Sequence, residues 1–361
     1  MPQAEDPAGL RMAPLAGWLD ASGLPIDASA ALTATLFPSG RSNVTYLLTD
    51  EAGTSVVLRR PPLGNVMPTA HDMAREHRVL TGLARVDYPA PRPLALCTDE
   101  DIIGAPFLIM EYVPGPILAT TEDTARLPSS ERGAASAALV ETLARLHALA
   151  PADAGLDDLG RPDGYLARQA ARWTKQWNLT KTRDLDTMDE LQRRVGHLIA
   201  ETPADARAAL VHGDYRLDNV ILDPETWQAR AVLDWEMSTL GDPLADLALM
   251  LVYWSEPSDT LRHVVPIAEN LTEADGFWGR QRIIDRYASA SGSTLDHLDA
   301  CTALACYKLA VIAESIHARA LSGKQLGTAA SGAGGMGEAT EALANMGLAV
   351  TDLGAVAGLS A

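Results

Sequence analysis

The chain has 361 residues, of which 47% are hydrophobic and 21% are charged. This composition excludes a disordered or fibrous protein, and the length allows about two domains. The net charge of −18 argues against nucleic-acid binding through a basic surface, but it suits either a cationic substrate or an ordinary solvated acidic surface.

The cysteines and the N-terminus bear on the compartment. Cys97, Cys301 and Cys306 are too few and too scattered for a disulfide framework or a zinc site. The first residues are acidic and proline-rich, and they lack the basic start and apolar stretch of a signal peptide. No uncharged apolar run reaches the roughly 18 residues of a membrane span. We therefore expect a cytoplasmic protein with no membrane or nucleic-acid partner; its oligomeric state is left open.

The first third of the chain contains the predicted strands. Residues Ala31–Tyr46 and Thr54–Arg60 predict hairpin strands, with a turn at Asp50–Gly53. The segment Ala70–Leu83 has the apolar face of a helix. Phe107–Met110 predicts a short buried strand.

The proline-rich run Pro114-Gly115-Pro116 interrupts this pattern, and beyond it the chain is mostly helical. We predict two lobes, residues 1–112 and residues 113–361. The predicted helices and short strands of the second lobe are Tyr165–Trp177, Leu210–Val211, Val220–Leu222, Ala231–Leu233, Ala245–Trp254, Arg280–Ser289 and Leu298–Leu321. The tail after Ser322 is rich in glycine and alanine, and we expect it to pack loosely.

The strongest indication of a chemical function is one continuous run of residues together with the strand and the aspartate that follow it. His212-Gly213-Asp214-Tyr215-Arg216-Leu217-Asp218-Asn219 precedes a short apolar strand, and Asp234 follows Asn219 by fifteen residues. Phosphoryl transfer needs a carboxylate that orients or deprotonates the attacking hydroxyl, and hard oxygen ligands for magnesium. A His-Gly-Asp turn alone would more often be a solvent-facing turn. The complete arrangement favours a phosphotransferase site.

This arrangement resembles the catalytic loop and metal-binding motif of the protein-kinase-like superfamily, and its His-Gly-Asp opening resembles the aminoglycoside phosphotransferase family. The resemblance implies an α+β, bilobal protein-kinase-like fold with a small β-rich N-lobe and a large helical C-lobe. It implies that residues 1–112 form the N-terminal nucleotide-binding lobe and that residues 113–361 form the C-terminal catalytic and substrate-binding lobe. It implies that Asp214 is the catalytic base, that Asn219 and Asp234 hold Mg2+, and that ATP is the donor. Trp235-Glu236 stands where protein kinases have Phe-Gly.

The resemblance extends to a cation and a carboxylate in the first lobe. Arg59 stands at the strand position of the phosphate-pairing lysine of kinases, and Glu76 on the next helix is placed to pair with it. Strand alternation favours Arg59 over Arg60. Each residue taken separately could be an ordinary surface charge, but their order favours the pair, which we count with Asp214 among the catalytic residues.

Two further segments are candidates for nucleotide contacts. The loop Pro38–Asn43 would cover the phosphates, with Gly40, Ser42 and Asn43 as donors. It has a single glycine, and alone it would be an ordinary hairpin turn. Glu111 and Val113 belong to a segment that resembles the adenine-binding hinge, where backbone groups contact the purine.

Two glycine-containing motifs lie later in the chain. Gly241–Leu247 matches a family motif that begins a helix, and we expect Asp242 to cap that helix and Asp246 to brace the catalytic loop. Gly332–Gly337 satisfies the dinucleotide-binding pattern formally. No convincing strand precedes it, so a flexible loop before a short helix is expected instead.

The acceptor is the least determined part of the function. Leu58–Pro62, Ala70–Asp72, Gly160–Pro162 and Tyr165–Gln169 resemble a subgroup that includes kinase-like domains joined to acyl-CoA dehydrogenases in animals. That resemblance implies a small-molecule acceptor, a hydroxyacyl-CoA or a hydroxy acid. Two alternatives stay open. One is an aminoglycoside kinase, favoured by the acidic composition; the other is a nucleotide-binding pseudokinase, supported by Arg59 and the glycine-poor loop.

Overall fold

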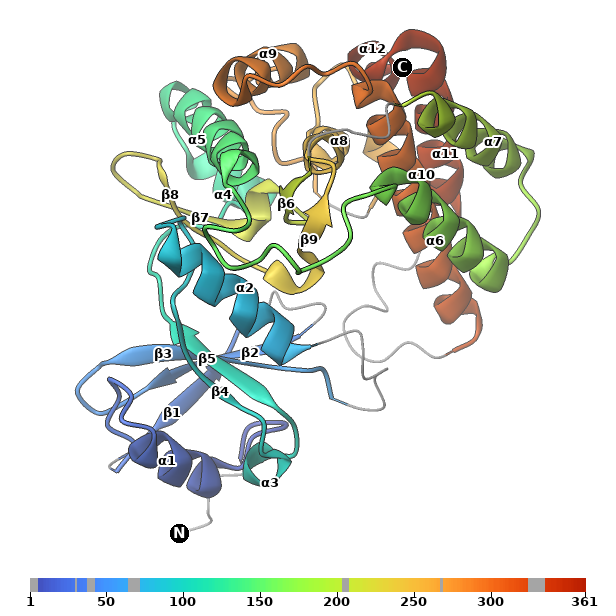
Figure 1. Ribbon diagram of the computed structural model, residues 1–361. Helices are drawn as coiled ribbons and strands as arrows, with labels where there is room; N and C mark the ends of the chain where they lie inside the picture. The colour runs from blue at the N-terminus through green and yellow to red at the C-terminus, as the bar shows by residue number, and fades with distance from the viewer. Residues whose placement is uncertain are drawn as a thin grey trace. The chain divides into compact units, whose positions relative to one another are not determined.

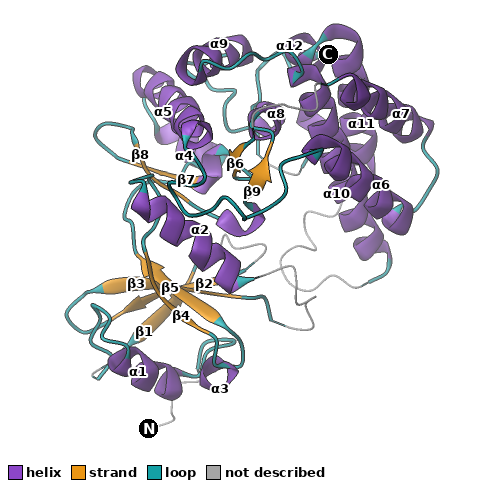
Figure 2. Cartoon of the chain, viewed as in Figure 1, coloured by secondary structure: helices purple, strands orange, loops and turns teal. Residues whose placement is uncertain are grey.

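The computed structural model describes residues 6–29, 31–37, 43–63, 72–202, 208–266, 269–323 and 335–361. Its contacts group the chain into two compact units. The first unit comprises residues 1–115, 153–156 and 230–236, and the second comprises the remainder. Strands are concentrated in the first unit and helices in the second (Figures 1 and 2). This content confirms the predicted α+β class, while the lobe boundary at residue 112 stays a prediction.

The first unit is built on an antiparallel sheet of five strands in the order β1-β2-β3-β5-β4. The strands are β1 (Thr33–Leu36), β2 (Val44–Thr49), β3 (Ser55–Arg60), β4 (Pro93–Cys97) and β5 (Phe107–Glu111). Because β1 and β2 pair antiparallel, the segment Ala31–Tyr46 turns back on itself and is not one strand. The second hairpin has its turn at Asp50–Gly53, where the Asp50 amide donates to the Thr54 carbonyl.

Among the described residues of this unit, three helices accompany the sheet. They are α1 (Met12–Ala21), α2 (Met73–Arg85) and α3 (Glu100–Ile103). Helix α1 buries Leu15 and Leu19 in the core that includes Leu48 and Ile109. Helix α2 begins at Asp72, whose side chain accepts a hydrogen bond from the Arg75 amide at 3.0 Å and so satisfies an amide at the helix start. The sequence pattern had not predicted α1 or α3.

The second unit is mainly helical. Its helices are α4 (Thr121–Arg126), α5 (Ser129–Ala148), α6 (Tyr165–Thr180), α7 (Asp186–Glu201), α8 (Leu244–Tyr253), α9 (Arg280–Ser291), α10 (Leu298–Leu321), α11 (Met336–Leu353) and α12 (Ala355–Ser360). Helix α10 packs against α6, α7, α8 and α11. It is therefore surrounded by other helices and buries residues on most of its circumference.

Short strands carry the segments of chemical interest. They are β6 (Ala209–Val211), β7 (Val220–Leu222), β8 (Ala229–Val232) and β9 (Thr239–Gly241). Strands β6 and β9 pair antiparallel, with Leu210 opposite Leu240. Both leucines are buried, so this small ribbon anchors the two segments that leave it at Val211 and Gly241.

The predicted loose tail is wrong for residues 336–361, which form α11 and α12. Leu343, Met346 and Val350 are buried on α11. A Cβ atom at Gly347 would lie 2.7 Å from Leu191 Cδ2 of α7, so the small residues permit close helix packing. The glycine-rich run ends in α11, an 18-residue helix that begins after Gly335. Its residues 332–334 lie outside the described part.

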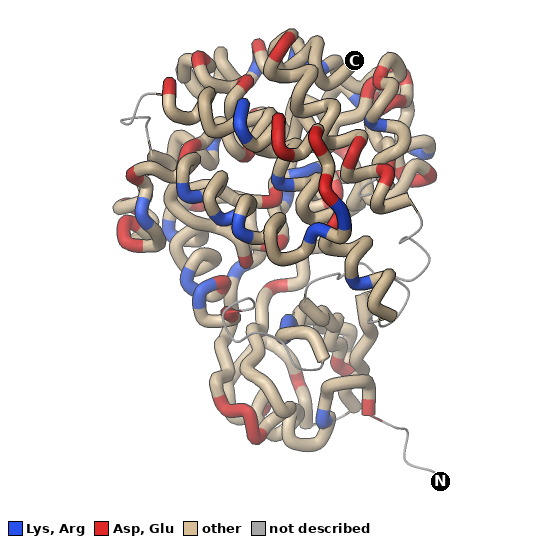
Figure 3. The backbone as a smooth tube through the Cα atoms, turned by 90° about the vertical axis from the view of Figure 1, so that its right-hand side faces the viewer, with Lys and Arg blue, Asp and Glu red and all other residues tan. Residues whose placement is uncertain are grey.

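Charged residues of both signs are interspersed along the chain (Figure 3). The net charge of −18 is therefore not the property of one acidic segment. Within the described residues, none of the helices combines the length and the apolar character that crossing a membrane requires.

Candidate active site

The turn that presents Asp214 depends on a glycine. Gly213 has a φ of +85°, and a Cβ atom there would lie 2.9 Å from both the Cβ and the carbonyl oxygen of Met237. A side chain at this position would therefore meet both backbone strain and a steric clash. The Asp214 amide then donates a hydrogen bond to His212 Nδ1 at 3.2 Å. The local backbone thus requires the glycine of the His-Gly-Asp sequence.

Two side chains from distant helices hold the backbone of this turn. Asp246 of α8 accepts hydrogen bonds from the amides of His212 at 2.6 Å and Gly213 at 2.8 Å. Lys308 of α10 donates to the Gly213 carbonyl at 2.9 Å. His147 Nε2 lies 3.3 Å from the Asp246 carboxylate. Burial alone would raise the pKa of Asp246, but hydrogen bonds and charge from His147 and His212 lower it, which favours the ionised form.

Asp214 and Asn219 lie together at the start and end of the loop. Asn219 Nδ2 donates to the Asp214 carbonyl at 2.9 Å and lies 3.4 Å from Asp214 Oδ2. Both side chains are only partly buried. With its nitrogen turned toward Asp214, the Asn219 amide keeps its oxygen as the atom suited to a hard metal ion.

Two cations act on Asp214 electrostatically. Arg216 lies over the Tyr253 ring, 4.8 Å from its centroid, and forms an ion pair with Asp218. Burial acts to lower the pKa of Arg216, but Tyr253, Asp218 and Asp214 raise it. Burial lowers the pKa of Lys308, and the charge of Asp214 opposes that effect. Sequence reasoning missed Lys308, because a lysine inside a helix carries no motif.

In the first unit, Arg59 lies among three carboxylates. Its Nε is 3.1 Å from Glu76 Oε2, without the alignment of a hydrogen bond. Its Nη2 forms an ion pair with Asp234 and lies 3.7 Å from Glu236 Oε2. Asn43 Nδ2 donates to Glu236 Oε2 at 2.7 Å. The structure thus brings together Arg59, Glu76, Asp234 and Asn43, which are four of the predicted residues.

The charges of this cluster do not balance on their own. Burial raises the pKa of Glu76 to about 7, although Arg59 opposes this, and Asp234 and Glu236 raise it further. The same three carboxylates raise the pKa of Arg59 despite its burial. One guanidinium faces three carboxylates, so the donor set fits an additional hard cation.

Asp234 also has an unusual backbone. Its φ of +66° is in the left-handed region, which non-glycine residues seldom adopt. Aspartate tolerates this conformation better than most residues do. The backbone therefore sets the direction of a carboxylate that is predicted to bind the metal.

Arg60, the alternative to Arg59, and Glu111, a predicted nucleotide contact, have different hydrogen-bond partners. Arg60 points away from the carboxylate cluster and donates to the carbonyls of Gly9 and Ile103. Glu111 ends β5, and its amide donates to the Arg92 carbonyl at 2.9 Å. That amide is already used, so a contact to adenine would need the Glu111 carbonyl.

The other predicted nucleotide contacts are Val113 and three residues of the loop Pro38–Asn43. Val113 follows the end of β5 and is partly buried. Gly40 and Ser42 lie outside the described residues, so the phosphate-covering role of their loop stays a prediction. Asn43 is the described residue of that loop, and it is 2% exposed.

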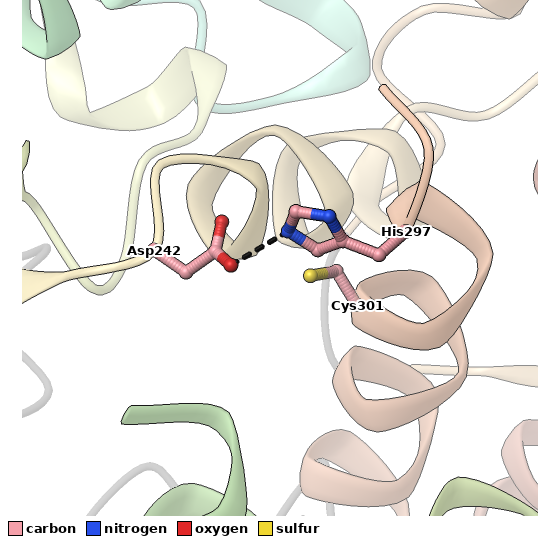
Figure 4. A group of neighbouring side chains, drawn as sticks. All are labelled: Asp242, His297 and Cys301. Atoms are coloured by element: carbon pink, nitrogen blue, oxygen red, sulfur yellow. Dashed lines mark hydrogen bonds and ion pairs between the residues drawn. The ribbon is translucent and has the colours of Figure 1, made fainter. Parts of the chain in front are cut away.

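Asp242 joins the starts of two helices. Its Oδ1 accepts a hydrogen bond from the Leu244 amide at 2.9 Å, at the first residue of α8. Its Oδ2 lies 2.7 Å from Nε2 of His297, the residue before α10 (Figure 4). The hydrogen bond to Asp242 raises the pKa of His297, which favours the imidazolium form.

Comparison with known proteins identifies relatives of most of the chain. The model of the phosphotransferase enzyme family, APH, matches residues 33–283. Acyl-CoA dehydrogenase family member 11 from Rattus norvegicus is 36% identical over 303 residues, which are 83% of this chain and 38% of the relative. This chain therefore spans well under half the length of that relative. An aminoglycoside 3'-phosphotransferase from Streptomyces fradiae is 32% identical over 189 residues, 50% of this chain and 64% of that protein.

Solved structures agree with the fold. A Ralstonia eutropha protein, solved as a candidate aminoglycoside phosphotransferase, has a TM-score of 0.78 and 29% identity, and the match covers 95% of this chain and 98% of that one. The GDP and kanamycin complex of an aminoglycoside 2''-phosphotransferase has a TM-score of 0.58 and 16% identity, covering 86% and 92% of the two chains. The second likeness establishes a shared fold alone.

Proposed function

Because this chain belongs to the phosphotransferase enzyme family, we propose that it transfers the γ-phosphoryl group of ATP to a hydroxyl group of a small molecule, with magnesium as the metal. The family supports the reaction class, and the nucleotide-bound neighbours support a nucleotide substrate. The observation that carries the proposal is the catalytic turn: Asp246 and Lys308 hold the backbone of Gly213 from two sides, and Asp214 follows it directly.

In this proposal Asp214 orients the acceptor hydroxyl and takes its proton while the new oxygen–phosphorus bond forms. The bond between the γ-phosphorus and its bridging oxygen breaks, and ADP leaves. Such transfers depend mainly on positioning and on electrostatic stabilisation. A turn whose amides and carbonyl are all held by side chains suits that requirement.

Asn219 and Asp234 are the proposed magnesium ligands. Both offer oxygen donors, and Asp234 stands in a cluster with more carboxylates than guanidinium groups. A bound magnesium ion would neutralise charge on the phosphates. Arg59, held by Glu76, is the proposed cation for the nucleotide phosphates, in place of the usual lysine.

We propose an anionic acceptor in preference to an aminoglycoside. Two cations, Arg216 and Lys308, interact with the charge of Asp214. Arg216 is paired with Asp218, and Lys308 donates to the Gly213 carbonyl. A small hollow in the second unit is lined by Arg216, Leu217, Asp218, Met250, Tyr253, Trp254, Glu269, Leu271 and Thr272. Its lining combines apolar side chains with the guanidinium of Arg216 and the carboxylates of Asp218 and Glu269. A hydroxy acid or hydroxyacyl-CoA is the proposed acceptor because the relatives bear the name acyl-CoA dehydrogenase.

Acceptor-dependent formation of ADP tests the proposal. The purified chain is incubated with MgATP and with pools of hydroxy acids, hydroxyacyl-CoA thioesters, uncharged diols or aminoglycosides. We expect ADP to form with the anionic pools and to disappear when magnesium is chelated. Turnover with the aminoglycoside pool would reverse the choice of acceptor. Nucleotide binding without turnover in any pool would favour the pseudokinase.

A further inference from the structure

Outside the candidate active site, three side chains of the second unit bring an oxygen, a nitrogen and a sulfur donor together (Figure 4). The donor atoms of Asp242, His297 and Cys301 all lie within 4.8 Å of one another. Asp242 and Cys301 are buried, and His297 is largely so. Although the cysteines by themselves are too scattered for a zinc site, we propose that Cys301 forms a binding site for one zinc ion together with Asp242 and His297.

The positions of the donors on the chain suit such a site. His297 immediately precedes α10, and Cys301 follows it by four residues, so both side chains face the same side of the helix start. Short spacings of this kind are common between zinc ligands on one element. Asp242 comes from the loop between β9 and α8, 55 residues away from His297 in sequence. The site therefore exists only in the folded chain.

The geometry needs small adjustments to accept an ion. In a tetrahedral zinc site with bonds of roughly 2.0–2.3 Å, donor atoms lie about 3.3–3.8 Å apart. The Asp242 oxygen and His297 nitrogen, now 2.7 Å apart, would separate, and the Cys301 sulfur would approach them. In the proposed site, rotations of these three side chains supply this change. Water would occupy the fourth position.

The charges also suit a buried zinc ion. The Asp242 carboxylate and a Cys301 thiolate balance the two positive charges, and a neutral imidazole completes the set. Binding forms one bond each from oxygen, nitrogen and sulfur to zinc. It releases the Cys301 thiol proton and the proton that His297 Nε2 donates to Asp242. No oxidation or reduction takes place, and a thiolate ligand selects zinc over magnesium.

Each of the two segments that supply zinc ligands also carries a residue that holds the proposed catalytic turn. Asp246 lies one helical turn after Asp242, and its carboxylate holds the amides of His212 and Gly213. Lys308 lies two turns after Cys301 on α10 and holds the Gly213 carbonyl. A zinc ion that ties the start of α8 to the start of α10 would thus fix both supports of the turn. The proposed role is structural and precedes any nucleotide chemistry.

Zinc titration of the full chain, without tag, nucleotide or magnesium, tests this site. We expect one bound zinc ion per chain, and a rise in melting temperature of roughly 5 °C with saturating zinc. Cobalt added as a probe should give the absorption of a thiolate–cobalt bond. The variants His297→Ala and Cys301→Ala should weaken binding on the order of 100-fold and remove that absorption.

Cys306→Ala provides the matched control. Cys306 is a buried thiol on the same helix but not in the donor set, so this variant should bind zinc as the wild type does. Circular dichroism checks that each variant folds. Absence of zinc binding in the folded wild type would mean an Asp242–His297 ion pair only, and it would overturn the proposal. Retention of the thiolate absorption in Cys301→Ala would overturn it equally.

Discussion

The carboxylate of Asp246 accepts a hydrogen bond of 2.8 Å from the Gly213 backbone amide, one residue before the proposed catalytic base. A buried side chain on α8 therefore controls the backbone of a turn 33 residues earlier in the chain. The second oxygen of the same carboxylate binds the His212 amide. Both oxygens of Asp246 are thus engaged as acceptors, which an amide side chain cannot reproduce.

We expect Asp246→Asn to lower the free energy of unfolding by about 3 kcal/mol, because the asparagine nitrogen would face a backbone N–H group in a buried place. Urea denaturation measures this change. The exposed variant Asp157→Asn should stay within about 0.5 kcal/mol of wild type. Equal effects of the two substitutions would contradict the assigned support.

The decrease in the free energy of unfolding caused by Asp246→Asn should depend on pH. Folding lowers the pKa of Asp246, so its contribution to stability is present above the unfolded value of about 3.9 and is lost as pH falls through the folded value. The difference between wild type and Asp246→Asn should therefore be full at pH 7 and shrink below pH 4. Denaturation curves across this range would show it, and a difference that grows with acid would contradict the ionised form.

Asp214→Ala should reduce turnover by roughly 10²–10⁴-fold, since the variant loses the group that positions the hydroxyl and accepts its proton. Nucleotide affinity should change little, because the proposed phosphate contacts lie on other residues. Steady-state kinetics and nucleotide titration separate the two quantities. Glu225→Gln, on the exposed turn after β7, is the control and should retain activity. Near-normal turnover of Asp214→Ala would refute the assignment.

Arg59 and Arg60 should respond differently to substitution. Arg59→Ala should weaken nucleotide binding on the order of 10–100-fold, whereas Arg59→Lys keeps the charge and should retain much of the affinity. Arg60→Ala should lower thermal stability and leave nucleotide affinity near wild type, because Arg60 holds the carbonyls of Gly9 and Ile103. Nucleotide titration and thermal melts decide this, and loss of binding in Arg60→Ala alone would exchange the roles.

Asp234→Asn should reduce the strengthening of nucleotide binding by magnesium on the order of 10-fold, because an amide oxygen brings no charge to a hard cation. The measurement is nucleotide affinity with and without magnesium. Asp87→Asn is a matched control, since Asp87 is an exposed aspartate that also has a positive φ, here 51°. An unchanged magnesium effect in Asp234→Asn would place the metal on other ligands.

The family and the fold class followed from the sequence, and both are confirmed by the family match and the structural neighbours. The reason is that the loop from His212 to Asn219 is a contiguous segment, so the spacing of its residues can be recognised in the sequence. The positions of Arg59 and Glu76 were also predicted, because Arg59 lies on a strand and Glu76 lies on the helix that follows it. Their roles and those of Asp214, Asn219 and Asp234 stay predictions.

The sequence pattern could not predict contacts between residues that are far apart in the chain. Lys308 meets the Gly213 carbonyl across 95 residues, and Asn43 meets Glu236 across 193. The glycine- and alanine-rich tail was misread because small residues serve tight helix packing as well as flexible loops. Only the tertiary structure distinguishes these uses, since it alone shows whether a neighbour occupies the space. Local sequence determined which chemical groups this protein presents, and the packing of distant helices decided which groups hold them in place.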